Sequence, residues 1–230
     1  MQTLTSTAED HRQSAVAYQR IKDAIISGEM GPGYQSLEPE LALRLGMSRT
    51  PVREALVRLE RDGFVELIPR RGMRVASLSP NDIYEITEVL ACLEVEAAAR
   101  LAANGASTEI LARFDQAIAA MDRALAQSDL AGWNEADYAF HLLLVQSCGN
   151  RHLVDTAQRF LEKADRFRVL TSAHRMPPTY SNVNHAAVVE AIRQRDPQSA
   201  AEIHRSHKRR WMRELEQILK RFTAPPESRP

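Results

Sequence analysis

Residues 46–63 read GMSRTPVREALVRLERDG and decide the fold of the first part of the chain. The hydroxyl of Ser48 or Thr50 can cap the free amide groups at the start of a helix, and Pro51 fits its first turn without losing a hydrogen bond. Gly63 marks the end of this helix. One apolar stripe recurs at helical spacing and comprises Val52, Leu56 and Leu59. The rest of the helix surface carries arginines, which must face water, acidic partners or nucleic acid.

Two further helices and a hairpin surround this helix. The first begins near Tyr18 and ends at Gly28, and the second covers Pro39–Leu45 and ends at Gly46. The stretch FVELIPRRGMRVASL (64–78) alternates apolar and polar residues on both sides of the turn PRRG, which predicts a small β-hairpin. Three short helices followed by a hairpin form the winged helix-turn-helix plan.

This part of the chain is locally basic. Formal charge balances to zero over the 230 residues, yet residues 44–74 hold eight arginines against four acidic residues. A solvated helix face is one interpretation. The other is a DNA surface, because Arg49 and Arg53 lie near the start of a recognition helix and the tip of the hairpin carries Arg70 and Arg71. Arginine suits this task, since it binds both phosphates and guanine edges.

Residues 83–222 have the apolar spacing of helices throughout. Breaks near 105–108, 127–132, 148–150, 174–181 and 195–198 divide this part into six helices rich in alanine and leucine, which favours an antiparallel bundle. The predicted fold class is therefore mainly α. The predicted parts are a mobile tail (1–15), a winged helix-turn-helix domain (16–76), a linker (77–82), a helical domain (83–222) and a second tail (223–230).

Composition predicts a cytoplasmic protein. Cys92 and Cys148 lie far apart and form no paired motif, which is typical of a reducing compartment. The first residues lack the apolar stretch of a secretory signal, and no apolar run approaches the roughly 20 residues of a membrane span. We therefore expect no membrane partner.

Polar residues with metal-binding side chains interrupt three apolar stripes of the helical part. Asp137 and His141 lie four residues apart on one stripe, His185 lies on a second, and His204 and His207 lie on a third. In one interpretation each is a core histidine satisfied by a hydrogen bond. In the other, one divalent transition metal ion per chain (Zn, Ni or Mn) satisfies them together, because unpaired imidazoles in an apolar bundle are costly to bury.

The stretches SRTPVREAL and LERDGFVELIPRRGMRVA resemble the DNA-binding half of the GntR superfamily of bacterial transcription regulators, over residues 16–76. The resemblance implies that Gly72 lets the wing approach DNA closely, and that the DNA surface is lined by Ser48, Arg49, Thr50 and Arg53. The chain departs from the family at Pro39, where an arginine commonly precedes the second helix. One expected contact to the operator is therefore missing.

The stretch DYAFHLLLVQSCGN resembles the Asp-x-x-x-His…Gly-Asn signature of the FCD effector domain in the FadR-type branch, and the likeness extends over residues 80–222. The resemblance implies a metal site made by Asp137, His141, His185 and His207. Four protein ligands leave two positions of an octahedral ion open for a carboxylate or hydroxy acid. His204 stands where the family usually has an apolar residue, and is expected to line the pocket or to compete as a ligand.

The sequence identifies a basic residue to bind an anionic effector less clearly than it identifies the metal ligands. The family often carries an arginine in Glu-Val-Arg of the first effector helix, where this chain has Leu90. Arg166 and Arg168 are the candidates in its place, with an ordinary surface role as the alternative. The remaining histidines lie in tail or loop contexts and receive no site; they are His11, His152 and His174.

These features predict a metabolite-responsive transcription regulator, a repressor as is commoner in such families, which binds operator DNA and senses an organic acid. One recognition helix buries too little surface for operator affinity, so we expect a homodimer. One alternative is a constitutive DNA-binding regulator with a purely structural metal. Another is a metal-dependent hydrolase fused to a DNA-binding domain, but no general base such as the glutamate of HExxH is present, and we expect no enzyme.

Overall fold

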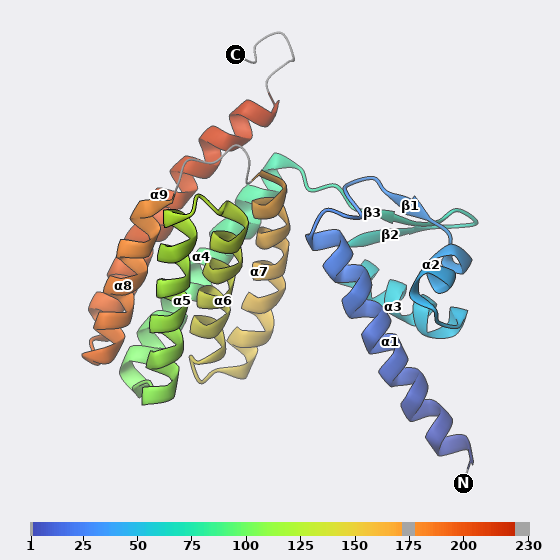
Figure 1. Ribbon diagram of the computed structural model, residues 1–230, viewed down its shortest axis with the longest axis horizontal. Coiled ribbons are helices and arrows are strands. Elements are labelled where there is room, and N and C mark those ends of the chain that lie inside the picture. Colours follow the sequence, from blue (N-terminus) through green and yellow to red (C-terminus); the bar gives the residue numbers. More distant parts are fainter. Residues whose placement is uncertain (1, 172–177, 224–230) are drawn as a thin grey trace. The chain divides into compact units, whose positions relative to one another are not determined.

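The computed structural model describes residues 2–171 and 178–223, and the chain divides after Leu78 into two compact units, residues 1–78 and 79–230 (Figure 1). Each unit encloses its own apolar core. The first is the predicted winged helix-turn-helix and the second is the predicted helical bundle, so the predicted fold class is confirmed. None of the described helices is both long enough and apolar enough to cross a membrane.

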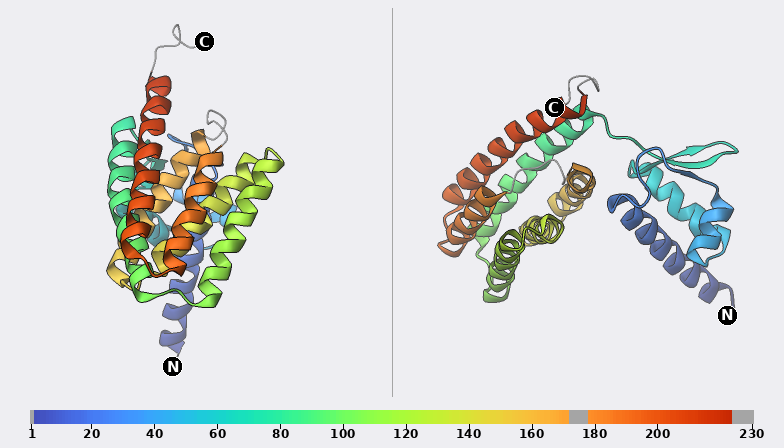
Figure 2. Two further views of the ribbon diagram at one scale, coloured as in Figure 1. Left: turned by 90° about the vertical axis from the view of Figure 1, so that its left-hand side faces the viewer. Right: turned by 45° about the horizontal axis from the view of Figure 1, so that its top comes forward.

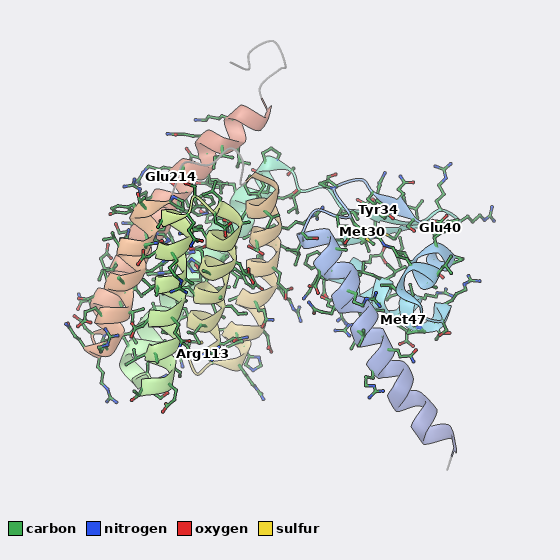
Figure 3. All side chains as sticks on the ribbon, viewed as in Figure 1. Met30, Tyr34, Glu40, Met47, Arg113 and Glu214 are labelled. Carbon is green, nitrogen blue, oxygen red and sulfur yellow. The ribbon has the colours of Figure 1, made fainter. Side chains whose placement is uncertain are left out.

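The first unit packs three helices against a small antiparallel sheet. Its elements are α1 (Gln2–Ile26), β1 (Gln35–Ser36), α2 (Glu38–Leu45), α3 (Arg49–Arg61), β2 (Val65–Ile68) and β3 (Gly72–Val75). The strand order is β1-β3-β2, and Leu67 pairs with Met73 in the hairpin. Apolar side chains of the helices and the sheet share one core, in which Met30 is buried while Tyr34 and Met47 pack against its margin (Figure 3).

Three local features differ from the sequence predictions. Residues 2–15, predicted as part of a tail, belong to α1, which begins at Gln2 because no glycine or proline interrupts residues 2–26 and extending a helix is easier than starting one. The strand β1 is not predicted, because two residues carry no detectable alternation. Ser48 occupies the N-cap position of α3, but its hydroxyl makes no capping hydrogen bond.

The second unit is a helical bundle. Its described helices are α4 (Pro80–Asn104), α5 (Thr108–Ala126), α6 (Leu130–Gln146), α7 (Arg151–Thr171), α8 (Thr179–Arg193) and α9 (Pro197–Thr223). Although α4 and α9 are distant in sequence, they lie side by side (Figure 2). Ser79 caps α4 by accepting a hydrogen bond from the Asp82 amide at 3.1 Å, so α4 starts inside the linker predicted over residues 77–82. Of the predicted tail from residue 223, residues 224–230 lie outside the described part.

The helix α6 is apolar on nearly all sides and is therefore enclosed by the bundle. Its buried apolar residues are Trp133, Ala136, Phe140, Leu143, Leu144 and Val145. Glu135 and Gln146 are exposed, but a polar residue on the same faces as these apolar residues is carried into the interior with them. This is why Asp137 and His141 are buried, at 4% and 2% exposure.

Gly72 is a position where the fold requires the absence of a side chain. Its φ of 79° is left-handed, and an added Cβ would lie 2.2 Å from the carbonyl oxygen of Ser36 in β1. The close approach of β1 therefore gives Gly72 a reason within the unit itself, besides the approach to DNA that the resemblance implies.

We predict that Gly72→Ala lowers the free energy of unfolding of the first unit by about 2–4 kcal/mol, because backbone strain and the contact with β1 both oppose a side chain. Chemical unfolding of the full-length protein, followed by circular dichroism, measures the loss. Gly33→Ala is the matched control, since Gly33 has a φ of 80° but no atom within 4 Å of an added Cβ. It should lose about 1 kcal/mol. Equal losses in the two variants would contradict the role of the β1 contact.

Candidate DNA-binding surface and histidine cluster

The start of α3 presents an exposed polar surface. The four residues that the resemblance places on DNA are all exposed there, namely Ser48, Arg49, Thr50 and Arg53. Three of them border a hollow in the surface of the first unit, whose lining is Ser14, Glu38, Arg49, Thr50, Arg53, Glu54, Val57 and Arg58. The start of a recognition helix is the part that reads base edges in the major groove. The surface therefore has the residues and the location that DNA reading needs.

The arginines of the basic segment divide according to their partners. Four are engaged within the unit: Arg44 by Glu29, Arg74 by Glu66 at 2.6 Å, Arg61 by Asp62 at 4.0 Å, and Arg58 by the Tyr18 ring at 4.5 Å. Arg49 lies 3.9 Å from Glu38. Within the described part of the chain, Arg53, Arg70 and Arg71 have no ion-pair partner. Those three charges remain available for phosphates or bases.

The tip of the hairpin holds a residue in an unfavourable conformation. The amide of Arg71 donates to the carbonyl of Ile68 at 2.9 Å, closing a turn with Pro69 at its second position and a φ of 64° at Arg70. This is the pattern of a type II turn, where glycine or asparagine usually occupies the third position. An arginine there costs about 1–2 kcal/mol. Strain of this kind at an exposed tip is characteristic of binding sites.

The histidines predicted on apolar stripes come together inside the bundle. His141 comes from α6, His185 from α8, and His204 and His207 from α9, and all four are buried. One ring nitrogen from each of His141, His185 and His207 lies within 4.8 Å of the others. Three helices thus bring three of the predicted metal ligands to one point.

Asp137 adds a carboxylate to this group. Its Oδ1 atom lies 3.6 Å from Nε2 of His141 and 3.6 Å from Nε2 of His185. Ligands about 2.0–2.1 Å from a tetrahedral zinc ion lie about 3.4 Å apart, so these separations fit a common ion with little adjustment. The other oxygen, Oδ2, accepts a hydrogen bond from Arg168 of α7, which leaves Oδ1 for an ion.

His185 provides the test of whether the donor set fits a metal. Its side chain is 0% exposed, and within the described residues neither ring nitrogen has a hydrogen-bond partner. The ring packs against Phe140, with centroids 4.2 Å apart. Burying an imidazole without replacing its hydrogen bonds to water costs about 1–3 kcal/mol. A metal ion bound at one nitrogen would offset that cost, so these residues fit the metal that the resemblance implies.

Two buried residues beside the histidine cluster, Glu94 and Lys208, were not identified by the sequence analysis. Glu94 of α4 lies with Oε1 3.1 Å from Nδ1 of His141 and with Oε2 3.4 Å from Nε2 of His204. Lys208 of α9 contacts the same Oε2 atom. A signal for both is present in the sequence, because Lys208 follows His204 by one helical turn and Glu94 interrupts a buried stripe. That stripe comprises Ile83, Thr87, Leu90, Ala97 and Leu101.

Burial and neighbouring charges act in opposite directions on the cluster. Burial lowers the pKa of His185 and His207 well below the usual value, and lowers the pKa of His204 to about 4. Burial also lowers the pKa of His141, but the carboxylates of Glu94 and Asp137 together outweigh burial, and the net shift of this pKa is upward. Three of the four imidazoles are therefore neutral near pH 7, the form that binds metals.

Arg166 and Arg168 are both buried, so the surface role considered for them is wrong. Arg168 bonds to Asp137 and lies 3.9 Å from Asp165. Burial lowers the pKa of Arg168, but the nearby acidic groups, with Asp137 first among them and Asp165 next, together outweigh burial and raise the pKa above its usual value. Its place in the cluster is thus to hold the carboxylate of Asp137.

Two family models match the chain. The model described as bacterial regulatory proteins, gntR family, matches residues 13–75, and the model of the FCD domain matches residues 85–210. The first range lies in the first unit, and the second range lies in the second unit. Each half thus matches the domain that its motifs resemble.

Curated relatives and solved structures agree with these matches. An "Uncharacterized HTH-type transcriptional regulator in the TAR-I ttuE-ttuC' intergenic region" of Agrobacterium vitis is 47% identical over 148 residues, which are 62% of this chain and 86% of the relative. The HTH-type transcriptional repressor RspR of Escherichia coli (strain K12) is 27% identical over 78% of each chain. Among solved structures, a transcriptional regulator (GntR family member) from Pseudomonas syringae pv. tomato str. DC3000 is 26% identical with a TM-score of 0.51, over 91% of this chain and 87% of the other. E. coli McbR/YncC has a TM-score of 0.77 over 89% of this chain and 97% of the other, and at 20% identity it shows the fold alone.

The metal-free protein is expected to lose stability as the pH falls from 7.5 to 5. His185, His204 and His207 have folded-state pKa values below the unfolded value of about 6.5, so the unfolded state binds more protons and acid favours unfolding. Each such histidine contributes up to about 1.4 kcal/mol per pH unit below that value, and His141, with its raised pKa, opposes the trend.

Chemical unfolding of chelator-treated protein at several pH values measures this dependence. The variant His204→Met removes one of the neutral imidazoles and should show a shallower loss between pH 7.5 and 5. A stability that rises toward pH 5 would contradict the assignment of neutral histidines.

Proposed function

The chain belongs to the gntR family of bacterial regulatory proteins and carries an FCD domain, and we propose that it is a repressor that senses an organic acid at a metal ion. The family match makes it a DNA-binding transcription regulator with an effector-binding domain. The metal, the effector class, the dimer and the sign of regulation are the parts that we add.

The observation that carries the metal proposal is His185, which is completely buried and has no hydrogen bond at either ring nitrogen from any residue that the structure describes. The residues that would hold the ion are Asp137, His141, His185 and His207. One carboxylate among imidazoles suits Zn, Ni or Mn. When bound, the ion supplies an electrophilic position for an oxygen atom of the effector.

An organic acid is the effector class that this site supports. Four protein ligands leave two positions on an octahedral ion, which a carboxylate with an adjacent hydroxyl can fill. The candidate residues for its surroundings are Arg166, Arg168 and His204, all of which are buried. Because Arg168 donates a hydrogen bond to Asp137, it contributes positive charge and holds this metal-ligand carboxylate in place. Its guanidinium is therefore not free to bind the effector with all of its donors.

Operator binding as a homodimer follows from the size of the DNA surface. The exposed face of α3 and the hairpin tip offer few side chains per chain, and two-fold pairing doubles their contacts. Repression is supported by RspR of Escherichia coli, which is named a transcriptional repressor. A purely structural metal is the alternative, and an effector screen by thermal shift separates the two, because a sensor gains stability from its ligand.

We predict that the purified protein holds about one transition metal ion per chain, and that His141→Ala, His185→Ala and His207→Ala each lose it. Elemental analysis after dialysis against a mild chelator measures the content. Each loss should also lower thermal stability, because an ion that binds only the folded state stabilises that state. His204→Met is the control and should keep its metal. Unchanged metal content in all three histidine variants would contradict the proposed metal site.

A second prediction concerns DNA. Arg53→Ala should weaken operator binding by about 1–3 kcal/mol and non-specific binding less, because its guanidinium is available for a bidentate base contact. Arg71→Ala on the wing should weaken both duplexes alike and flatten the salt dependence. Arg61→Ala removes an equal charge already beside Asp62, and should change little. Titrations against operator and scrambled duplexes at several salt concentrations measure these binding free energies. If Arg53→Ala weakens binding to the two duplexes equally, Arg53 does not read bases.

A further inference from the structure

The bundle contains a second set of metal-binding groups beside the proposed ion site. Donor atoms of Glu94, His141 and His204 lie within 4.8 Å of one another, and none of the three side chains is more than 3% exposed. Glu94 approaches Nδ1 of His141 at 3.1 Å, whereas Asp137 approaches Nε2 of the same ring at 3.6 Å. The two sets therefore share His141 and use its opposite nitrogens, so an ion in each set would make this ring a bridging imidazolate whose remaining N–H proton is released to solvent.

Lys208 already supplies a cation to this second set. Its ammonium contacts Oε2 of Glu94, the oxygen that also lies 3.4 Å from Nε2 of His204. The side chain of Lys208 is 10% exposed and that of Glu94 is 0% exposed, so solvent and salt screen this pair weakly. The positive charge thus lies against the carboxylate that a metal ion in this set would need.

We propose that Lys208 closes a latent second metal site formed by Glu94, His141 and His204, and so restricts the bundle to one ion. A divalent ion in this set would lie beside the ammonium, and like charges repel strongly where neither is well solvated. Without the ammonium, Glu94 would be a buried carboxylate without the lysine that now contacts its Oε2 atom, a state that favours capture of a cation. The identity of the first ion rests on the proposed function, but the closure of the second set does not.

The same contact makes Glu94 a positioning residue for the first site. Because Lys208 and His204 occupy Oε2, the other oxygen of Glu94 faces Nδ1 of His141. When an ion displaces a proton from His141, a carboxylate facing Nδ1 favours the tautomer with hydrogen on Nδ1, which leaves the lone pair of Nε2 for an ion held with Asp137. Lys208 thus keeps Glu94 as an outer partner of a metal ligand, and prevents it from becoming a ligand itself.

Zinc content of the full-length protein tests the proposal. After saturation with Zn²⁺ and removal of excess ion, Lys208→Met should hold one ion more than wild type, because methionine keeps an unbranched side chain but carries no charge. Lys208→Arg keeps the charge and should match wild type. The double variant Lys208→Met/His204→Met loses a ligand of the second set and should also match wild type.

The contrary outcomes are distinct. A folded Lys208→Met protein with wild-type zinc content overturns the proposal, and so does equal zinc content in Lys208→Met with and without His204→Met. The extra zinc ion expected in Lys208→Met depends on His204, whereas the ion of the proposed function depends on His185 and His207. If wild-type protein binds no zinc, the proposed metal function is contradicted. The difference in zinc content between Lys208→Met and wild type still tests the second set in that case.

His204→Met alone provides a measurement that does not need a folded Lys208 variant. In the presence of Lys208, this change should leave zinc content and affinity as in wild type, because the second set holds no ion. Loss of zinc in His204→Met would place an ion in the second set and overturn the closure by Lys208. Thermal unfolding with and without Zn²⁺ adds a second readout, since zinc should raise the melting temperature more in Lys208→Met than in wild type.

Discussion

Burial of ionisable groups inside a helical bundle is the constraint on which the second unit depends. Four imidazoles and two carboxylates lie where water cannot solvate them. A buried charge without a partner is strongly destabilising, and the carboxylates are accordingly paired, Glu94 with Lys208 and Asp137 with Arg168. Apolar residues at the same positions would avoid these costs, so the cluster is explained better by the ligand binding that we propose than by stability alone.

The cluster also joins helices that are far apart in sequence. His141 lies on α6, His185 on α8 and His207 on α9, while Glu94 and Arg168 extend the network to α4 and α7. Any ion or acid bound here has an affinity that depends on how these helices pack. By linkage, its binding biases that packing in return. The helix α4 also continues directly from the wing strand β3 through residues 76–79, so the chain itself connects the network to the DNA-binding unit.

Sequence reasoning predicted the histidines of this site but not their outer partners, and the difference is physical. A histidine among leucines at helical spacing is conspicuous, and the buried helix α6 could be recognised from its composition. Glu94 and Lys208 interrupt apolar stripes in the same way, but glutamate and lysine are common on the surfaces of helices. Which of the acids on α4 is buried depends on where α9 packs, and spacing within one helix carries no information on that contact. The short strand β1 was not predicted for a related reason, since it is defined by its pairing with β3.

Each of the two candidate binding sites contains a departure from local sequence rules. Arg70 occupies a turn position that suits glycine, at a cost that nothing inside the first unit is seen to repay. In the second unit, Glu94 and Lys208 stand at positions that suit leucine or alanine. Ser128 and Arg195 also have positive φ angles, but the apolar stripes of the described helices agree with the fold that they form, which is the usual relation between sequence and a stable structure. A chain selected for stability alone would have little reason to keep an arginine in a strained tip or an ion pair in an apolar core. Both departures become intelligible if the tip meets phosphate and the core pair governs which cations enter the histidine cluster.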